Sequence, residues 1–137
     1  MVTMAELLAQ AEKTPQRRRP PRDEEHRLQC ACVRWFRLSF PQYSKLLFAV
    51  PNGGARSKAT AGKLKAEGVV AGVADLLLLI PRGGHPLLAI EMKTPHGSQS
   101  PDQKAWQKKA ESIGIRYIIC RKFEDFVQEI REYLNEK

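Results

Sequence analysis

The residues with the clearest chemical potential are Asp75 and the triplet Glu91-Met92-Lys93, with fifteen residues between Asp75 and Glu91. Asp75 opens an apolar run over 76–80, and Glu91 closes another over 87–90. Both runs are typical of buried β-strands, and Arg82-Gly83-Gly84-His85 is a typical turn between them. In an antiparallel hairpin the charged ends would lie side by side. Two carboxylates and an ammonium gathered there would suit binding a divalent cation and hydrolysing a phosphodiester.

The alternative for these charges is a structural ion pair between Lys93 and one of the two acids. Period-2 alternation places Glu91 and Lys93 on one face of their strand, with Ile90 and Met92 on the other. Burying a charged group that directly follows an apolar run costs free energy unless the group is paired or coordinates a metal. The placement therefore favours a site, although a D…ExK pattern alone also occurs by chance.

Composition indicates one globular domain with a polyanionic partner. The chain has 137 residues and a net charge of +8, and residues 1–123 carry twenty-one basic and ten acidic side chains. This excess favours nucleic acid, whereas a membrane surface would call for a basic amphipathic helix with aromatic anchors, which the sequence lacks. No membrane span or signal peptide is visible. The three cysteines are expected to be reduced, buried thiols, so we expect an intracellular, cytoplasmic and DNA-associated protein.

The hydrophobic pattern predicts an α/β fold with a mixed sheet. Residues 1–22 are expected to form a flexible basic extension, with a short helix over 4–13, and residues 23–137 a single domain. Asp23 is the predicted N-cap of the first long helix, and Ser100-Pro101-Asp102-Gln103 predicts a capping box. The predicted elements are a helix over 23–40, a strand over 45–50, a helix over 57–67, the hairpin over 74–93, a helix over 101–112, a strand over 115–120 and a helix over 122–134.

Several motifs together resemble the PD-(D/E)XK nuclease superfamily, and more closely its virus-type replication-repair nuclease (VRR-NUC) family. They cover about residues 24–120 and read Glu25-x-x-x-Gln29, Ala49-Val50-Pro51-Asn52-Gly53-Gly54, Gly68-Val69-Val70-Ala71-Gly72-Val73-Ala74-Asp75, Ile90-Glu91-Met92-Lys93 and Ser100-Pro101-Asp102-Gln103-x-x-Trp106. Ala74 departs from the proline of many relatives. The resemblance implies a restriction-endonuclease-like αβββαβ core, here with an inserted helix and a C-terminal helix.

The resemblance also implies roles for individual residues. Asp75, Glu91 and the Met92 carbonyl would bind Mg²⁺, for which Mn²⁺ would substitute, and Lys93 would position water or stabilise the transition state. Glu25 would be a further acidic residue, although Glu24 is adjacent and a solvated first-turn glutamate is the alternative. Gln103 would point into the site in addition to its capping role.

Contacts with DNA are expected from the loop after the first strand and from the short helix that follows. The candidates are Asn52, Gly53, Arg56, Lys58, Lys63 and Lys65. The glycines permit close approach of a phosphate, but a tight turn explains them equally well, and a charge run often only solvates a face. Lys104, Lys108 and Lys109 form a weaker second candidate.

The expected activity is that of a metal-dependent, structure-selective DNA endonuclease. The resemblance implies cleavage that leaves a 5′-phosphate, and small relatives of this kind suggest a homodimer acting on four-way (Holliday) junctions. Two alternatives remain at this level. One is a monomeric nuclease for flaps or duplex DNA, and the other is a DNA-binding module without catalysis.

Overall fold

A computed structural model describes residues 2–12, 21–51 and 57–137. The elements follow the order α1 (Met4–Glu12), α2 (Pro21–Ser39), the 3₁₀ helix η1 (Pro41–Leu46), β1 (Leu47–Ala49), α3 (Lys58–Ala66), β2 (Leu76–Leu78), β3 (Leu88–Met92), α4 (Pro101–Ser112), β4 (Arg116–Cys120) and α5 (Phe123–Asn135). Within the described residues, no helix combines the length and apolar character needed to cross a membrane.

The four strands form one mixed sheet in the order β1-β2-β3-β4. β2 pairs antiparallel with both β1 and β3, and β4 is parallel to β3. Parallel neighbours require a crossover, which α4 provides between β3 and β4. The predicted mixed α/β architecture is therefore confirmed.

The turn of the central hairpin forms where it was predicted. Arg82 and His85 pair through two backbone hydrogen bonds of 3.0 and 2.8 Å. Gly83 and Gly84 between them have φ values of +56° and +81°. A two-residue loop with both φ values positive matches the right-handed twist of the flanking strands, and glycine adopts it without strain. This turn contributes to setting the register of β2 against β3.

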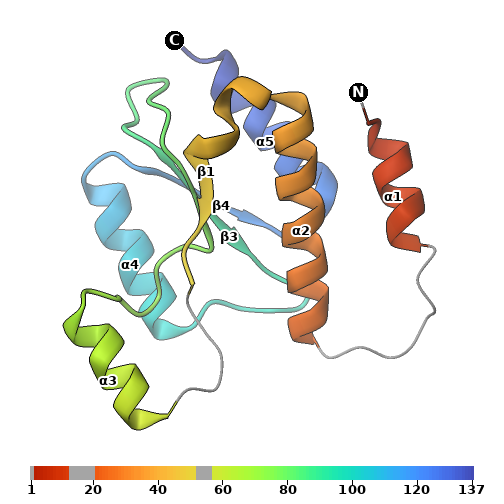
Figure 1. The fold of residues 1–137 in the computed structure, drawn as a ribbon. Helices are drawn as coiled ribbons and strands as arrows, with labels where there is room; N and C mark the ends of the chain where they lie inside the picture. The colour runs from red at the N-terminus through yellow and green to blue at the C-terminus, as the bar shows by residue number, and fades with distance from the viewer. Residues whose placement is uncertain (1, 13–20, 52–56) are drawn as a thin grey trace.

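Helices cover the two faces of the sheet unequally, as Figure 1 shows, with α2 and α5 on one side and α4 on the other. The larger core lies under α2 and α5 and includes Phe36, Ile90 and Phe126. The smaller core lies under α4 and is built on Ala74, Ala89 and Tyr117, with Trp106 packed against it. Leu88, Ile90 and Met92 thus point to one face, and Ala89 and Glu91 to the other, as the alternation predicted.

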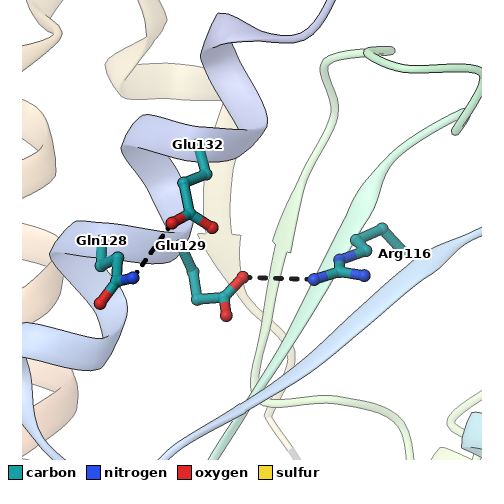
Figure 2. Close-up of polar contacts among 4 residues, drawn as sticks. All are labelled: Arg116, Gln128, Glu129 and Glu132. Atoms are coloured by element: carbon teal, nitrogen blue, oxygen red, sulfur yellow. Dashed lines mark hydrogen bonds and ion pairs between the residues drawn. The ribbon is translucent and has the colours of Figure 1, made fainter.

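Helix α5 also contacts the sheet through a charged side chain, as Figure 2 shows. Arg116, at the start of β4, lies 3.4 Å from Glu129, and Gln128 donates a hydrogen bond of 3.0 Å to Glu132. Both members of the ion pair are partly exposed, so solvent screening leaves it a minor contribution to stability. The apolar stripe of α5, from Phe123 to Tyr133, is what holds this helix on the sheet.

Three sequence predictions require correction. The strand expected over 45–50 is shorter, because Pro41 starts a 3₁₀ helix that includes Lys45 and Leu46. Helix α2 begins at Pro21, so Asp23 lies in its first turn and is not its N-cap. Cys30 is exposed, with its sulfur 3.5 Å from His26 Nε2, whereas Cys32 and Cys120 are buried as expected.

The N-terminal region differs in part from a free extension. Leu7 of α1 is buried in the larger core, so α1 packs on α2. Residues 13–20, which include most of the predicted basic tether, lie outside the described residues. The division of the chain at residue 22 stays a prediction.

Tyr133→Phe tests the junction between α5 and the end of β2. The buried Tyr133 hydroxyl donates a hydrogen bond of 2.6 Å to the Ile80 carbonyl. Because the variant leaves that carbonyl without its partner, we expect the free energy of unfolding to fall by about 1–3 kcal/mol. Urea unfolding measures the change. Tyr43→Phe is the control, since the half-buried Tyr43 hydroxyl has no hydrogen-bond partner among the described residues. Equal losses in both variants would contradict this account.

Candidate active site

The Asp75 and Glu91 side chains meet at one end of the β2–β3 hairpin. Leu76 pairs with Ile90, so continuing the antiparallel register by one residue sets Asp75 opposite Glu91. The Met92 amide donates a hydrogen bond of 2.7 Å to Asp75 Oδ2, and the Asp75 carbonyl accepts one of 2.9 Å from Val50. Asp75 is thereby held between β1 and β3, at the place the sequence predicted.

Glu91 is fully buried and held by two side chains from different elements. Tyr117 of β4 donates to Glu91 Oε2 at 2.8 Å, and Gln103 of α4 donates to Glu91 Oε1 at 3.2 Å. Burial raises the pKa of Glu91, and the Asp75 carboxyl raises it further as a hydrogen-bond partner and as a like charge. The hydrogen bond from Tyr117 and the charge of Lys93 act in the opposite direction. Two carboxylates in this setting resist simultaneous ionisation unless a cation joins them.

The Tyr117 hydroxyl stays protonated in this position. Burial raises the pKa of Tyr117, and its hydrogen bond to Glu91 and the charge of that carboxylate raise it further. Gln99 donates to the same hydroxyl oxygen at 3.1 Å and to Gln107 Oε1 at 2.9 Å. A chain of hydrogen bonds therefore runs from α4 through the loop before it to Glu91.

Lys93 is buried beside the two carboxylates and is covered by the loop over 94–97. A Cβ on Gly97 would stand 3.7 Å from Lys93 Cδ, so this loop packs along the lysine stem. Arg121 holds the loop, since its guanidinium donates to the carbonyls of Thr94 at 2.9 Å and Gly97 at 2.6 Å. The ammonium makes no ion pair within 4.0 Å with any described residue. The ammonium charge lowers the pKa of Glu91, and without a direct counter-ion it is available to meet an anion that enters the site.

Gln103 serves the helix and the site at once. The backbone nitrogen of Gln103 donates to Ser100 Oγ at 3.2 Å, and the side-chain oxygen of Gln103 accepts from the backbone nitrogen of Ser100 at 2.9 Å. These two bonds complete the predicted capping box. The remaining Nε2 donates to Glu91, so Gln103 points toward the site as expected and meets a carboxylate there. The first turn of α4 is thus tied directly to the end of β3.

Gly72 brings the segment before Asp75 against the same turn of α4. Its φ is +83°, and a Cβ there would overlap the Asp102 carbonyl group and stand 2.8 Å from the Gln103 amide nitrogen. Only glycine permits this close approach in this backbone conformation. The path of the chain into Asp75 and the position of Gln103 therefore depend on each other.

The other predicted site residues are not joined to this cluster by a described contact. Glu25 is half-buried on α2 and makes no hydrogen bond or ion pair with another described residue. Lys58, Lys63 and Lys65 are exposed on α3, a helix at the periphery of the molecule (Figure 1). Asn52, Gly53 and Arg56 lie outside the described residues.

Three side chains of the site were missed by reasoning from the sequence. They are Tyr117, Gln99 and Arg121. β4 is parallel to β3, and Tyr117 lies on the same face of the sheet as Glu91. A polar side chain in the apolar run over 115–120 was therefore the available signal for Tyr117. Gln99 and Arg121 lie in connecting segments and carried no comparable signal.

The donors present suit a hard divalent cation with an incomplete protein ligand set. Carboxylate and backbone carbonyl oxygens are the ligands that Mg²⁺ and Mn²⁺ accept, and Mg²⁺ usually retains several waters. Among the described residues, no three His, Cys, Asp or Glu side chains gather closely enough to hold a metal ion. A cation here would therefore be held by two carboxylates, backbone oxygen and water.

Gly72→Ala tests the packing of this segment on α4. The variant combines a strained positive φ with a steric overlap, so we expect a clear loss of thermal stability and of the Gln103–Glu91 contact. Gly68→Ala is the matched control, since Gly68 has a φ of +107° with nothing within 4 Å of a Cβ. In the control, the free energy of unfolding should fall only by the cost of the backbone strain, about 1–3 kcal/mol. Melting curves and amide spectra of both variants measure the difference, and equal losses would refute the steric argument.

Glu91→Gln tests the buried carboxyl in a buffer that contains a chelator. The pKa of Glu91 lies above its ordinary value of 4.5 in the folded protein. As pH rises above 4.5, the carboxyl loses its proton in the unfolded chain before it does so in the folded protein, so the free energy of unfolding falls. The slope from one proton reaches about 1.4 kcal/mol per pH unit. We expect Glu91→Gln to remove this slope and to be more stable than the parent at pH 7, as thermal unfolding between pH 5 and 8 would measure. Parallel stability curves for the two proteins would argue against it.

Comparisons with known proteins identify the family and the fold. The sequence model of the VRR-NUC domain matches residues 9–123. A solved structure described as a VRR_NUC domain protein has a TM-score of 0.70 and 23% identity, covering 82% of this chain and 89% of that chain, and it supports the fold. No curated protein matches. The chain belongs to the VRR-NUC domain family, and its function is of the nuclease, DNA-processing type.

Proposed function

We propose that this chain is a divalent-metal-dependent deoxyribonuclease that hydrolyses phosphodiester bonds. The observation that carries the proposal is the meeting of Asp75 and Glu91 at one end of the hairpin, with Lys93 buried two residues further along. A purely structural role would not explain two adjacent carboxylates, of which one is fully buried. A site that binds a cation and a phosphate gives all three charges a partner.

The metal ligands in this proposal are Asp75, Glu91 and the carbonyl of Met92. Mg²⁺ is the expected ion, and Mn²⁺ should substitute, because both accept hard oxygen ligands. When bound, the ion lowers the pKa of a coordinated water and neutralises charge on the phosphate. Asp75 is already aligned by the Met92 amide, and Glu91 is aligned by Tyr117 and Gln103.

Lys93 would act on the substrate, and two further residues would assist. Its ammonium, free of a direct ion pair, would hold the attacking water or stabilise negative charge on the phosphate in the transition state. Gln103 would keep the Glu91 carboxylate in place through its side-chain amide. Glu25 would contribute a further acidic group from α2, a helix that contacts β3.

A basic surface supports DNA as the substrate. The three lysines of α3 are exposed, and this helix contains no acidic residue. Lys104, Lys108 and Lys109 of α4 are exposed as well. Lysines that neutralise phosphates release counter-ions, so binding through these helices would weaken steeply with salt. Asn52, Gly53 and Arg56 complete the proposed DNA-contacting set.

We further infer that the substrate is branched DNA, with the four-way junction as the preferred form, cut by a homodimer. A junction presents equivalent strands, and a twofold-symmetric enzyme would present two sites to two of them. Exposed apolar side chains on and beside the edge strand β1, namely Leu46, Phe48 and Leu79, leave surface that a second subunit could cover.

The metal-dependent activity is tested with labelled four-way junction, flap and duplex DNA. The purified protein should cut in Mg²⁺ or Mn²⁺ and be inactive in EDTA. Asp75→Asn and Lys93→Met should each reduce the rate by roughly 100-fold or more, because each removes charge needed at the reacting phosphate. Lys45→Met, an exposed lysine on η1, is the control and should cut like the parent. If Asp75→Asn and Lys93→Met retain parental rates, the assigned site is wrong.

The same substrates distinguish the finer proposals. A preference for the junction together with a dimer in sedimentation supports the junction-resolving enzyme. A monomer that cuts flaps or duplex better would replace it with the simpler nuclease. Binding of every substrate without cleavage in either metal would identify a DNA-binding module and overturn catalysis.

A further inference from the structure

The Tyr117 hydroxyl has an unusual partner for a buried tyrosine. It donates to Glu91 Oε2 at 2.8 Å and accepts from Gln99 at 3.1 Å. The other deeply buried tyrosine, Tyr133, instead donates to a backbone carbonyl at 2.6 Å. A backbone carbonyl satisfies a hydroxyl without further effect, whereas a bond to a carboxylate also sets the orientation of that carboxylate.

We propose that Tyr117 is a positioning residue that fixes the Glu91 carboxylate for binding of the divalent metal ion. This inference rests on the proposed function and extends it to a residue of β4. Tyr117 would not touch the metal or the DNA; it would act only through Glu91.

The Glu91 carboxylate needs such a restraint. The terminal torsion of a glutamate side chain is broad and roughly twofold, so the carboxylate does not hold one orientation unaided. The like charge of Asp75 on the facing strand would also turn it away from the shared site. Tyr117 and Gln103 counter both effects by holding one oxygen each, Tyr117 from β4 and Gln103 from α4.

The direction of the Tyr117 hydrogen bond is itself determined by neighbouring groups. Because Gln99 donates to the hydroxyl oxygen, the hydroxyl proton is free to point at Glu91. Gln99 is held in turn by Gln107 Oε1 at 2.9 Å. Tyr117 is buried, and the centroid of its ring lies 6.1 Å from the centroid of the Trp106 ring. A rigid aromatic side chain with two torsions is thus anchored at both ends, as a positioning group requires.

The test measures binding of Mn²⁺ alone by calorimetry, without DNA, so that it does not depend on activity. Tyr117→Phe should bind Mn²⁺ roughly 10-fold more weakly or worse, the usual effect of removing a partner that orients a ligand. Tyr133→Phe is the matched control and should bind Mn²⁺ like the parent although it is less stable. Gln99→Met, which removes the donor to the Tyr117 hydroxyl together with the bond to Gln107 and leaves Tyr117 itself in place, should give an intermediate loss. A role limited to stability would leave all three dissociation constants equal to that of the parent.

The outcomes separate this inference from the proposed function through Asp75→Asn. If Asp75→Asn loses Mn²⁺ binding and Tyr117→Phe retains the parental dissociation constant, the positioning role is overturned and the metal site stands. If Asp75→Asn binds Mn²⁺ like the parent, the metal site itself is refuted. Should Tyr117→Phe fail to fold, an unchanged dissociation constant for Gln99→Met overturns the inference instead.

Discussion

The antiparallel register of β2 against β3 is the constraint on which the site depends. It sets Asp75 opposite Glu91 and forces two like charges together at the end of an apolar hairpin. A slip of one residue would turn Glu91 toward the large core under α2 and α5, where a carboxylate would be far more costly. The same slip would move Leu88, Ile90 and Met92 out of that core. The core therefore enforces the register, and the register enforces the encounter of the carboxylates.

The unequal faces of the sheet explain where the polar groups are accommodated. Large side chains such as Phe36, Ile90 and Phe126 fill the face under α2 and α5. Ala74 and Ala89 lie on the other face under α4, and Gln103 of that helix reaches Glu91 there. Tyr117 enters the same layer from β4. The face under α2 and α5 is thus the apolar one, and the face under α4 holds the hydrogen-bonding groups of the site.

Local and tertiary requirements coincide at the first turn of α4. Gln103 closes the capping box with Ser100 and reaches Glu91 with the same amide group. Gly72 packs against this turn and leads directly into Asp75. A change in the helix start would therefore be felt at both carboxylates. Gln103 therefore lies on a helix whose first residue is fixed by its cap. Residues of a site are held most accurately when the elements that carry them are rigid in this way.

The sequence by itself determined the features that arise from local chemistry. Glycines at positive φ define the Gly83-Gly84 turn, Ser100 and Gln103 define a helix start, and alternation within each strand assigns its faces. Asp75 and Glu91 could thus be predicted to meet, since one short hairpin joins them. Tertiary structure alone decided which partners Glu91 acquires and what holds the loop beside Lys93. Tyr117 is twenty-six residues from Glu91 and meets it only after the crossover through α4, and Arg121 reaches Gly97 across a similar separation. Contacts of this kind depend on how whole elements pack, and the chain carries no short-range pattern that encodes them.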